Sequence, residues 1–501
     1  MGGTGGTVLS GGTAGLGGTA RAGERTQIFE VSTLYGAATL AAALDAGQFG
    51  ARGEARRALL LSNNAAVPET AASLREMTGW ARIAARFDVV LDWNDTIYPH
   101  HPSDWGPSDR DSPVWERLLR HSWGLGDGPV ELILESVHAR PAAALASVFA
   151  NAAITVYADG LMSYGPTRDR LPQDTAIRIR RLLHLDLVPG LRPLLLGEHG
   201  VEPEVVPDAA FRAVLDEISG QQERRPDAAD VVSPPDGAKG TDGGEAGEAG
   251  EGQRPGATSS VAVILGQYLA ALEILTPREE EALHERMLRG AAAAGFRAVI
   301  FKPHPTAPAQ YSKALEKAAA DVGVRLTVLD TPMLAETVFD HYRPGLVVGC
   351  FSTAMFTAAA YYGLPIARVG TGLLLERITP YQNSNRVPLT IVDALVPDLE
   401  AGAAGEVVTE RPDAAEAIGP LVRTVGFCMQ SKVNPELRAE AEAWLDAELN
   451  EHTWRYFKRA RLTALALPGG FASGLARQLP GGGRALRIAR RVRRATLRNK
   501  T

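Results

Sequence analysis

Two short stretches of this sequence carry residue types that could transfer a chemical group. Asp159 follows the apolar run AAITVY, and His304 lies in the sequence Lys-Pro-His-Pro just after the apolar run FRAVIF. Ligands of open α/β sheets bind beyond the carboxyl ends of the strands, so we expect the acid and the histidine to face one cleft. There, one side chain could take a proton from an acceptor while the other supports a leaving group.

Both residues also have a plainer structural interpretation. Asp-Gly pairs are common where a strand turns into a loop, and the spacing alone favours that interpretation for Asp159 and Gly160. His304 stands between two prolines, and it could equally be a turn histidine that bonds local backbone. Lys302 could place a positive charge near a phosphate, or it could be a solvated residue at the edge of the sheet.

A third stretch is suited to binding an anion. The apolar run GLVVGC leads through Phe351 into Ser352, Thr353 and a helical stretch of small residues. The N-terminus of such a helix binds anions through its free N–H groups and its dipole, and the two hydroxyls add donors. Ser352 could also simply cap the helix, and the two roles are compatible. Gly266 and Gln267, directly after the run SVAVIL, are weaker candidates for the same cleft.

Two further features invite a functional interpretation. Asp109 and Asp111 have the spacing of a metal-binding Asp-x-Asp motif, but they lie in a polar loop with no strand before them, so metal binding is the weaker interpretation. Tyr98, His100 and His101 belong to the aromatic segment NDTIYPHHPSDW, which could line a sugar site or form an ordered loop. Histidines without partners at ligand spacing do not argue for zinc.

The surrounding sequence alternates apolar runs with helical patterns, which predicts parallel sheets covered by helices. We expect strands at residues 26–31, 58–62, 89–93, 130–134, 153–157, 260–266, 296–301, 325–330, 345–350 and 365–369. One helix start is well marked, with Thr276 as N-cap, Pro277 at the first position and Glu279 at the third. That helix should end near Gly295.

The chain should therefore form two Rossmann-like domains followed by C-terminal helices, which is the outline of a GT-B glycosyltransferase. We expect a disordered Gly-rich tail at 1–24, an N-terminal Rossmann-like domain at 25–222, a disordered linker at 223–258, a C-terminal Rossmann-like domain at 259–428, C-terminal helices at 429–468 and a basic tail at 469–501. The linker is rich in Gly, Pro, Ala, Glu and Asp and cannot bury a core.

Composition narrows the class of protein. The chain has 501 residues, a net charge of −6 and 45% hydrophobic residues, so it should be globular, with no overall field that attracts nucleic acid. Two cysteines, Cys350 and Cys428, do not make a disulfide framework and suggest a reducing cytoplasm. We expect no secretory signal and no transmembrane helix. The segment Arg484–Lys500 holds eight basic residues and no acid, so it could bind an anionic membrane surface from the cytoplasmic side.

Taken together, the chain resembles the bacterial polysialyltransferases and their capsular relatives over roughly 26–220 and 260–420. The resemblance lies in the stretches TQIFEVSTLYGAATLAAALDAG, NDTIYPHHP, VYADGLMSYGPTR, VILGQYL, FKPHP and GCFSTAMFTAA. It implies a GT-B fold, a CMP-sialic acid donor, a glycan acceptor that can be lipid-linked, and direct inversion without a metal or other cofactor.

The resemblance also implies roles for individual residues. The second acid of the family's acid-acid-Gly motif is the general base and falls on Asp159. The family's HP histidine, which contacts the CMP phosphate, falls on His304, and its hydroxyl pair falls on Ser352 and Thr353. The first acid of the motif is replaced by Ala158, which could change acceptor handling or the pKa of Asp159, because a like charge nearby raises a carboxyl pKa.

Two other classes of function compete with this one. A teichoic-acid-type CDP-glycerol glycerophosphotransferase also uses HP histidines, but it needs a second histidine suited to phosphoryl chemistry, and only His101, followed by Pro102 in a loop, is available. A catalytically inactive glycan-binding relative is the non-enzyme alternative, and Ala158 is its only support. The sequence leaves open the particular nonulosonic acid, the linkage, and single transfer against polymerisation.

Overall fold

The computed structural model describes residues 21, 23–65, 67–220, 261–304, 310–402 and 414–471. Most of the expected Gly-rich tail, the whole expected linker and almost all of the basic tail, including Arg484–Lys500, lie outside the described residues. None of the described helices is long and apolar enough to cross a membrane.

The first unit is a seven-stranded parallel sheet in the order β3-β2-β1-β4-β5-β6-β7. Its strands are β1 (Thr26–Val31), β2 (Arg56–Leu61), β3 (Val89–Asp92), β4 (Val130–Leu134), β5 (Ala153–Ala158), β6 (Ile179–His184) and β7 (Pro203–Val205). Its helices are α1 (Leu34–Asp45), α2 (Trp80–Ala84), α3 (Trp93–Ile97), α4 (Ser112–Ser122), α5 (Ala142–Val148), α6 (Gln173–Ala176) and α7 (Asp208–Ser219), with 3₁₀ turns η1 (Pro68–Thr70), η2 (Leu74–Glu76), η3 (Leu161–Tyr164) and η4 (Gly197–His199).

The second unit is a five-stranded parallel sheet in the order β10-β9-β8-β11-β12. Its strands are β8 (Val261–Leu265), β9 (Ala298–Lys302), β10 (Arg325–Val328), β11 (Leu346–Gly349) and β12 (Ile366–Arg368). Its helices are α9 (Pro277–Ala293), α10 (Gln310–Val322), α11 (Ala335–Tyr342), α12 (Thr353–Tyr362), α13 (Thr371–Arg377) and α14 (Arg386–Leu395), with the 3₁₀ turn η5 (Leu399–Ala401).

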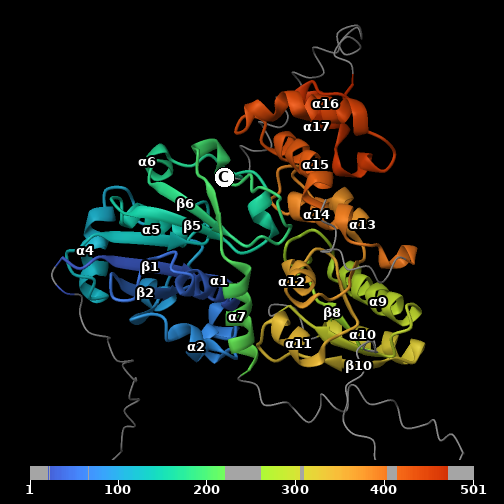
Figure 1. Ribbon diagram of the computed structural model, residues 1–501, viewed down its shortest axis with the longest axis horizontal. Coiled ribbons are helices and arrows are strands. Elements are labelled where there is room, and N and C mark those ends of the chain that lie inside the picture. Colours follow the sequence, from blue (N-terminus) through green and yellow to red (C-terminus); the bar gives the residue numbers. More distant parts are fainter. Residues whose placement is uncertain are drawn as a thin grey trace, which may run out of the picture.

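The described part of the chain ends in a helical group that lies beyond the second sheet (Figure 1). It contains α15 (Ala414–Met429), α16 (Arg438–Glu448), α17 (Arg459–Leu465) and the turns η7 (Pro435–Leu437) and η8 (Thr453–Tyr456). The group also contacts the first unit, because the side-chain amide of Gln430 donates a hydrogen bond to the carbonyl of Arg168. This layout of two Rossmann-like units and C-terminal helices is the expected GT-B type.

All ten strands expected from the sequence are present, with small shifts at their ends. The expected helix is α9, where Thr276 and Glu279 form a reciprocal capping box and Gly295 follows the end with a φ of 95°. β6 and β7 were not expected. The sequence of β6 is IRRLLH, and its two arginines interrupt the apolar pattern by which a strand is predicted, although the apolar positions are buried.

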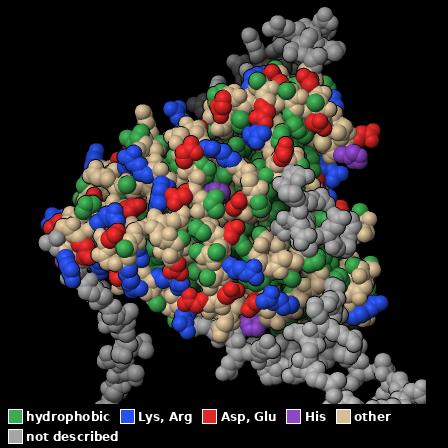
Figure 2. All heavy atoms as spheres, viewed as in Figure 1, with side chains coloured by type: hydrophobic (Ala, Val, Ile, Leu, Met, Phe, Trp, Pro, Cys, Tyr) green, Lys and Arg blue, Asp and Glu red, His purple; other side chains and the backbone are tan. Residues whose placement is uncertain are grey.

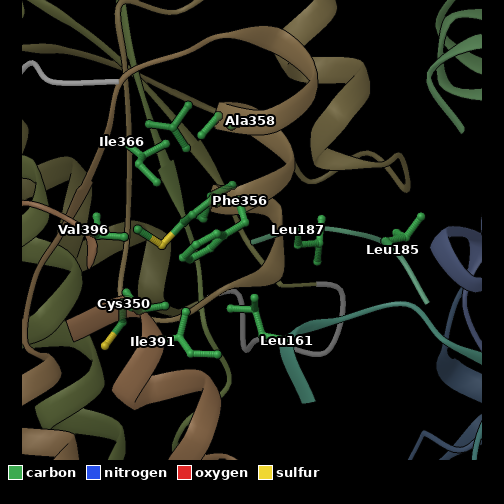
Figure 3. Close-up of a cluster of buried hydrophobic side chains, with 14 of the residues drawn as sticks. Leu161, Leu185, Leu187, Cys350, Phe356, Ala358, Ile366, Ile391 and Val396 are labelled. Atoms are coloured by element: carbon green, nitrogen blue, oxygen red, sulfur yellow. The ribbon is translucent and has the colours of Figure 1, made fainter. Parts of the chain in front are cut away.

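The two units share one hydrophobic core. A single cluster of buried side chains contains residues from both sheets. Leu161 and Leu187 of the first unit lie among Phe356 and Ile391 of the second (Figure 3). Polar contacts cross the same boundary: the Tyr361 hydroxyl of α12 donates to Asp208 at the start of α7 over 3.1 Å. The units are therefore held in a defined arrangement that brings the carboxyl ends of their strands together.

Candidate active site

The strand order places the site. In both sheets the order reverses direction at the first strand, between β1 and β4 and between β8 and β11. Loops that leave such a switch point in opposite directions open a crevice where ligands bind. The residues that follow β5, β8, β9 and β11 are the ones that sequence reasoning selected, and they lie around the boundary between the units.

Asp159 is half-buried directly after β5 and faces the start of α1. A Cβ added at Gly36 would lie 3.2 Å from Asp159 Oδ2 and 3.1 Å from the Tyr157 hydroxyl, so the glycine gives the carboxylate its room. Burial, followed by the nearby Glu135 carboxylate, raises the pKa of Asp159 to about 7. A carboxylate with such a pKa can serve as a general base near neutral pH.

The opposite wall is the loop after β9. The backbone N–H of Gly266, directly after β8, donates to the Lys302 carbonyl over 2.8 Å. A Cβ at Gly266 would lie 2.9 Å from Pro303 Cα and 3.0 Å from the His304 nitrogen, so only glycine lets the two loops approach this closely. The Tyr268 ring packs against the His304 ring with centroids 4.0 Å apart. These contacts fix the position of the imidazole.

Burial shifts the pKa values of the two basic groups in this wall. Burial, with the Lys302 ammonium as a second cause, lowers the pKa of His304 to about 4. Burial also lowers the pKa of Lys302, whose ammonium donates to the carbonyls of Pro303 over 3.5 Å and Thr331 over 3.4 Å. Gln267 is buried, and its backbone N–H donates to His284 Nε2 over 3.3 Å, so it supports the loop from behind.

The N-terminus of α12 closes the site from a third side. Ser352 is its N-cap, and the Ser352 hydroxyl accepts a hydrogen bond from the Ala354 N–H over 3.3 Å. A Cβ added at Gly160 would lie 2.9 Å from the Thr353 Oγ1. The turn that carries Asp159 therefore touches the helix that presents the hydroxyl pair, although the two come from different units.

A cleft of about 540 Å³ lies between these walls. Its lining includes Gly266, Tyr268, Lys302, His304, Ser352 and Thr353. Asp159 does not line the cleft itself. Two residues that do line it are neighbours of the Asp159–Gly160 turn: Thr353, which Gly160 approaches, and Tyr35, whose pKa the Asp159 carboxyl helps to raise. The Tyr35 hydroxyl also joins the two units, because it lies 3.0 Å from the Thr357 Oγ1.

A second hollow of about 950 Å³ adjoins the cleft, because Ser32, Asn63, Ala71, Ala72 and Leu74 line both. Tyr98, His100 and His101 line this outer hollow. The Tyr98 side chain is 79% exposed, while the His101 ring is held by the Ser103 hydroxyl at 2.7 Å and the Ala65 carbonyl at 2.8 Å. Tyr98 is therefore free to meet a ligand, whereas His101 braces the loop.

Asp109 and Asp111 line neither hollow. The Ser108 hydroxyl donates to Asp111 over 2.7 Å just before α4, so this pair belongs to the start of a helix. Across the described ranges, no group of three or more His, Cys, Asp and Glu side chains is placed to hold a metal ion.

Sequence reasoning missed three side chains of the site. Tyr268 packs on His304, Glu336 lines the cleft from α11, and Glu135 lies next to Asp159. Burial raises the pKa of Glu336 to about 7. Glu135 is the one with a usable signal, because it directly follows the strand run VELIL as Asp159 follows its own strand.

Comparisons with known proteins identify a family for most of the chain. The model of the alpha-2,8-polysialyltransferase (POLYST) family matches residues 27–370. No curated protein matches the chain. Among solved structures, UDP-GlcNAc 2-epimerase from Neisseria meningitidis is 11% identical with a TM-score of 0.41, covering 79% of this chain and 98% of that one. The GT-B domain of a sialyltransferase from Photobacterium damselae is 10% identical with a TM-score of 0.37, covering 74% and 96%.

Proposed function

Since this chain belongs to the alpha-2,8-polysialyltransferase family, we propose that it is an inverting, metal-independent sialyltransferase using a CMP-activated sialic or related nonulosonic acid. The acceptor is a glycan. The observation that carries the proposal is the contact between the Asp159–Gly160 turn and the N-terminus of α12, which puts a candidate base beside a candidate phosphate site.

The acceptor hydroxyl loses its proton to Asp159 as its oxygen attacks the anomeric carbon. A new carbon–oxygen bond forms on one face of the sugar while the bond to the CMP phosphate breaks on the other, so the configuration inverts. The electron pair of the broken bond leaves with CMP. The raised pKa of Asp159 supports this role, because a base works best when its pKa lies near the working pH.

The departing CMP phosphate needs donors that are already in place. The free N–H groups and dipole of α12, the hydroxyls of Ser352 and Thr353, and the His304 ring supply them in the proposed complex. The low pKa of His304 is caused by burial and the Lys302 ammonium. A phosphate beside the ring favours the imidazolium form, so donor binding should raise that pKa and strengthen the contact.

The outer hollow is the proposed acceptor side, with Tyr98 as a surface for a sugar ring and His100 at its rim. A glycerophosphotransferase gains no support from the geometry, because His101 is engaged with Ala65 and Ser103 and lines only the outer hollow.

The proposal is tested by offering CMP-sialic acid and CDP-glycerol to the purified chain with a panel of glycans and reading the products by mass spectrometry. Asp159→Asn should bind CMP normally but lower turnover about 10²-fold or more, because the amide cannot take the proton. Asp109→Asn, an exposed acid of the same unit, is the control and should keep full activity. Normal turnover by a folded Asp159→Asn protein would exclude Asp159 as the base, and a requirement for metal ions would return attention to Asp109 and Asp111.

A further inference from the structure

A half-buried carboxyl group that the mechanism does not use lies beside the candidate base. Glu135 directly follows β4, the strand next to β5. The register pairs Leu134 with Val156, so the next pair is Glu135 with Tyr157. Side chains alternate between the faces of a sheet, so Glu135, Tyr157 and Asp159 project from the same face.

Glu135 is held firmly in this position. The Ser32 hydroxyl, at the end of β1, donates to Glu135 Oε2 over 2.5 Å. The backbone N–H of Glu135 donates to Glu30 Oε2 over 3.3 Å, and the Ser62 hydroxyl donates to Glu30 Oε1 over 3.1 Å. The ends of β1, β2 and β4 therefore fix a carboxylate against the end of β5.

Residue 158 lies on the other face. Ala158 is the last residue of β5, and its side chain packs against the core cluster that contains Val156, away from Tyr157. An acid at this position would project away from Asp159. This chain lacks the family's first acid. Its replacement by Ala158 leaves Glu135 in place, and Glu135 is the acid on the same face of the sheet as Asp159.

We infer that Glu135 is the positioning residue that controls the ionisation of Asp159, an inference that rests on the proposed function. The other titratable groups near Asp159 are Tyr157 on its own strand and Tyr35 on α1, with Glu336 beyond Tyr35 and Glu30 behind Glu135. Both tyrosines have raised pKa values and stay neutral at working pH. Burial raises the pKa of Glu135 too, but the hydrogen bond from Ser32 opposes that rise by stabilising the carboxylate form, so Glu135 is the neighbouring acid whose charge acts on Asp159.

The sign of the effect follows from electrostatics. A like charge nearby and burial both disfavour the carboxylate form, and both raise the pKa of Asp159. The base works only when deprotonated, so kcat/KM should fall below about pH 7 in the natural protein. Removing the negative charge of Glu135 lowers the pKa of Asp159, and the acid limb of the pH profile moves to lower pH.

The test compares pH profiles of kcat/KM for sialyl transfer from CMP-sialic acid. Glu135→Gln should move the acid limb down by about one unit, so that at about pH 5.5 it retains up to about tenfold more of its own maximum than the natural chain. Ser32→Ala should move the limb in the same direction by less, because losing its hydrogen bond makes Glu135 harder to ionise. This second variant serves if Glu135→Gln does not fold.

Two matched variants separate this role from a structural one. Glu131→Gln lies on the same strand and face, where Glu131 accepts from the Gln27 side-chain amide over 3.0 Å at the far end of β4, and it should leave the limb in place. Ala158→Asp restores the missing acid and should move the limb far less than Glu135→Gln does. An unmoved limb in both Glu135→Gln and Ser32→Ala, or an equal shift in Glu131→Gln, would overturn the inference. The absence of sialyl transfer by the natural chain would instead refute the proposed function.

Discussion

At the residue scale, burial favours the neutral forms of Asp159, the candidate base, and of His304, which lines the cleft. It raises the pKa of Asp159 to about 7 and lowers that of His304 to about 4. Between these two pH values Asp159 is mostly protonated and the His304 ring is mostly neutral. Above about pH 7 the base ionises, while the histidine gains its charge only when an anion arrives.

Removing the His304 imidazole should therefore mainly weaken the binding of the CMP phosphate. We predict that His304→Ala weakens CMP binding by about tenfold or more, the usual value of a hydrogen bond to a charged group. His121→Ala, an exposed histidine on α4, should bind CMP normally. Isothermal titration with CMP measures both, and unchanged affinity in a folded His304→Ala protein would remove His304 from the donor site.

The sequence identified Asp159 and His304 because each follows a strand run, and strand ends of parallel sheets meet at one edge. It did not identify Glu336 or Tyr268, because nothing in their local sequence says which surface they face. Glu336 becomes part of the cleft only through the packing of α11 against the first unit, and Tyr268 only through its contact with His304. The end of a strand can be predicted from the local sequence, whereas these contacts depend on how elements that are distant in the sequence pack together.

At the element scale, the donor wall depends on the close approach of two loops. The loops after β8 and β9 cross at Gly266, where any side chain would meet backbone atoms of Pro303 and His304. Backbone cannot rotate away as a flexible side chain can, so the approach tolerates no Cβ. The position of His304 is therefore set partly by a residue that makes no contact through a side chain of its own.

We predict that Gly266→Ala displaces the His304 loop and weakens CMP binding by at least as much as His304→Ala does. The reason is steric, because the new Cβ would lie within 3.1 Å of three backbone atoms. Gly372→Ala in α13 of the same unit is the control, since its Cβ would meet nothing within 4 Å and a helical alanine is favoured. CMP titration and thermal denaturation of both variants decide the matter, and normal CMP affinity in Gly266→Ala would contradict this account.

Most strands of the two sheets could be predicted from the sequence, but β6 could not. Runs such as VAVIL and AVIF are apolar throughout because parallel strands are covered on both faces. β6 was not predicted because Arg180 and Arg181 interrupt its apolar pattern. Arg181 instead reaches out to the carbonyl of Gln48 over 2.9 Å and to Glu204 over 3.3 Å, contacts that only the folded sheet supplies.

At the scale of the whole molecule, the shared core fixes the cleft, and the charge distribution indicates which surfaces could bind other molecules. One hydrophobic cluster spans both units, so the cleft between them is a built feature of the fold. On the face shown in Figure 2, acidic and basic side chains are interspersed, with no broad basic patch that would suit nucleic acid. The concentrated positive charge of this chain is in the sequence after Gly483.

That charge leads to a prediction for the full chain, made from its sequence. Arg484–Lys500 holds eight basic residues, and Ala485, Ile488, Ala489 and Val492 recur at helical spacing among them. Each basic residue near an anionic bilayer contributes about 1 kcal/mol, reduced by salt, so we expect reversible, shallow binding. In liposome sedimentation, the full chain should bind phosphatidylserine vesicles at low salt and leave them at high salt, whereas a chain ending at Gly483 should stay in solution. Neutral phosphatidylcholine vesicles should bind neither. Equal binding of both chains to the anionic vesicles would show that the tail is not the anchor, and the acceptor would then have to reach the cleft without membrane docking through this segment.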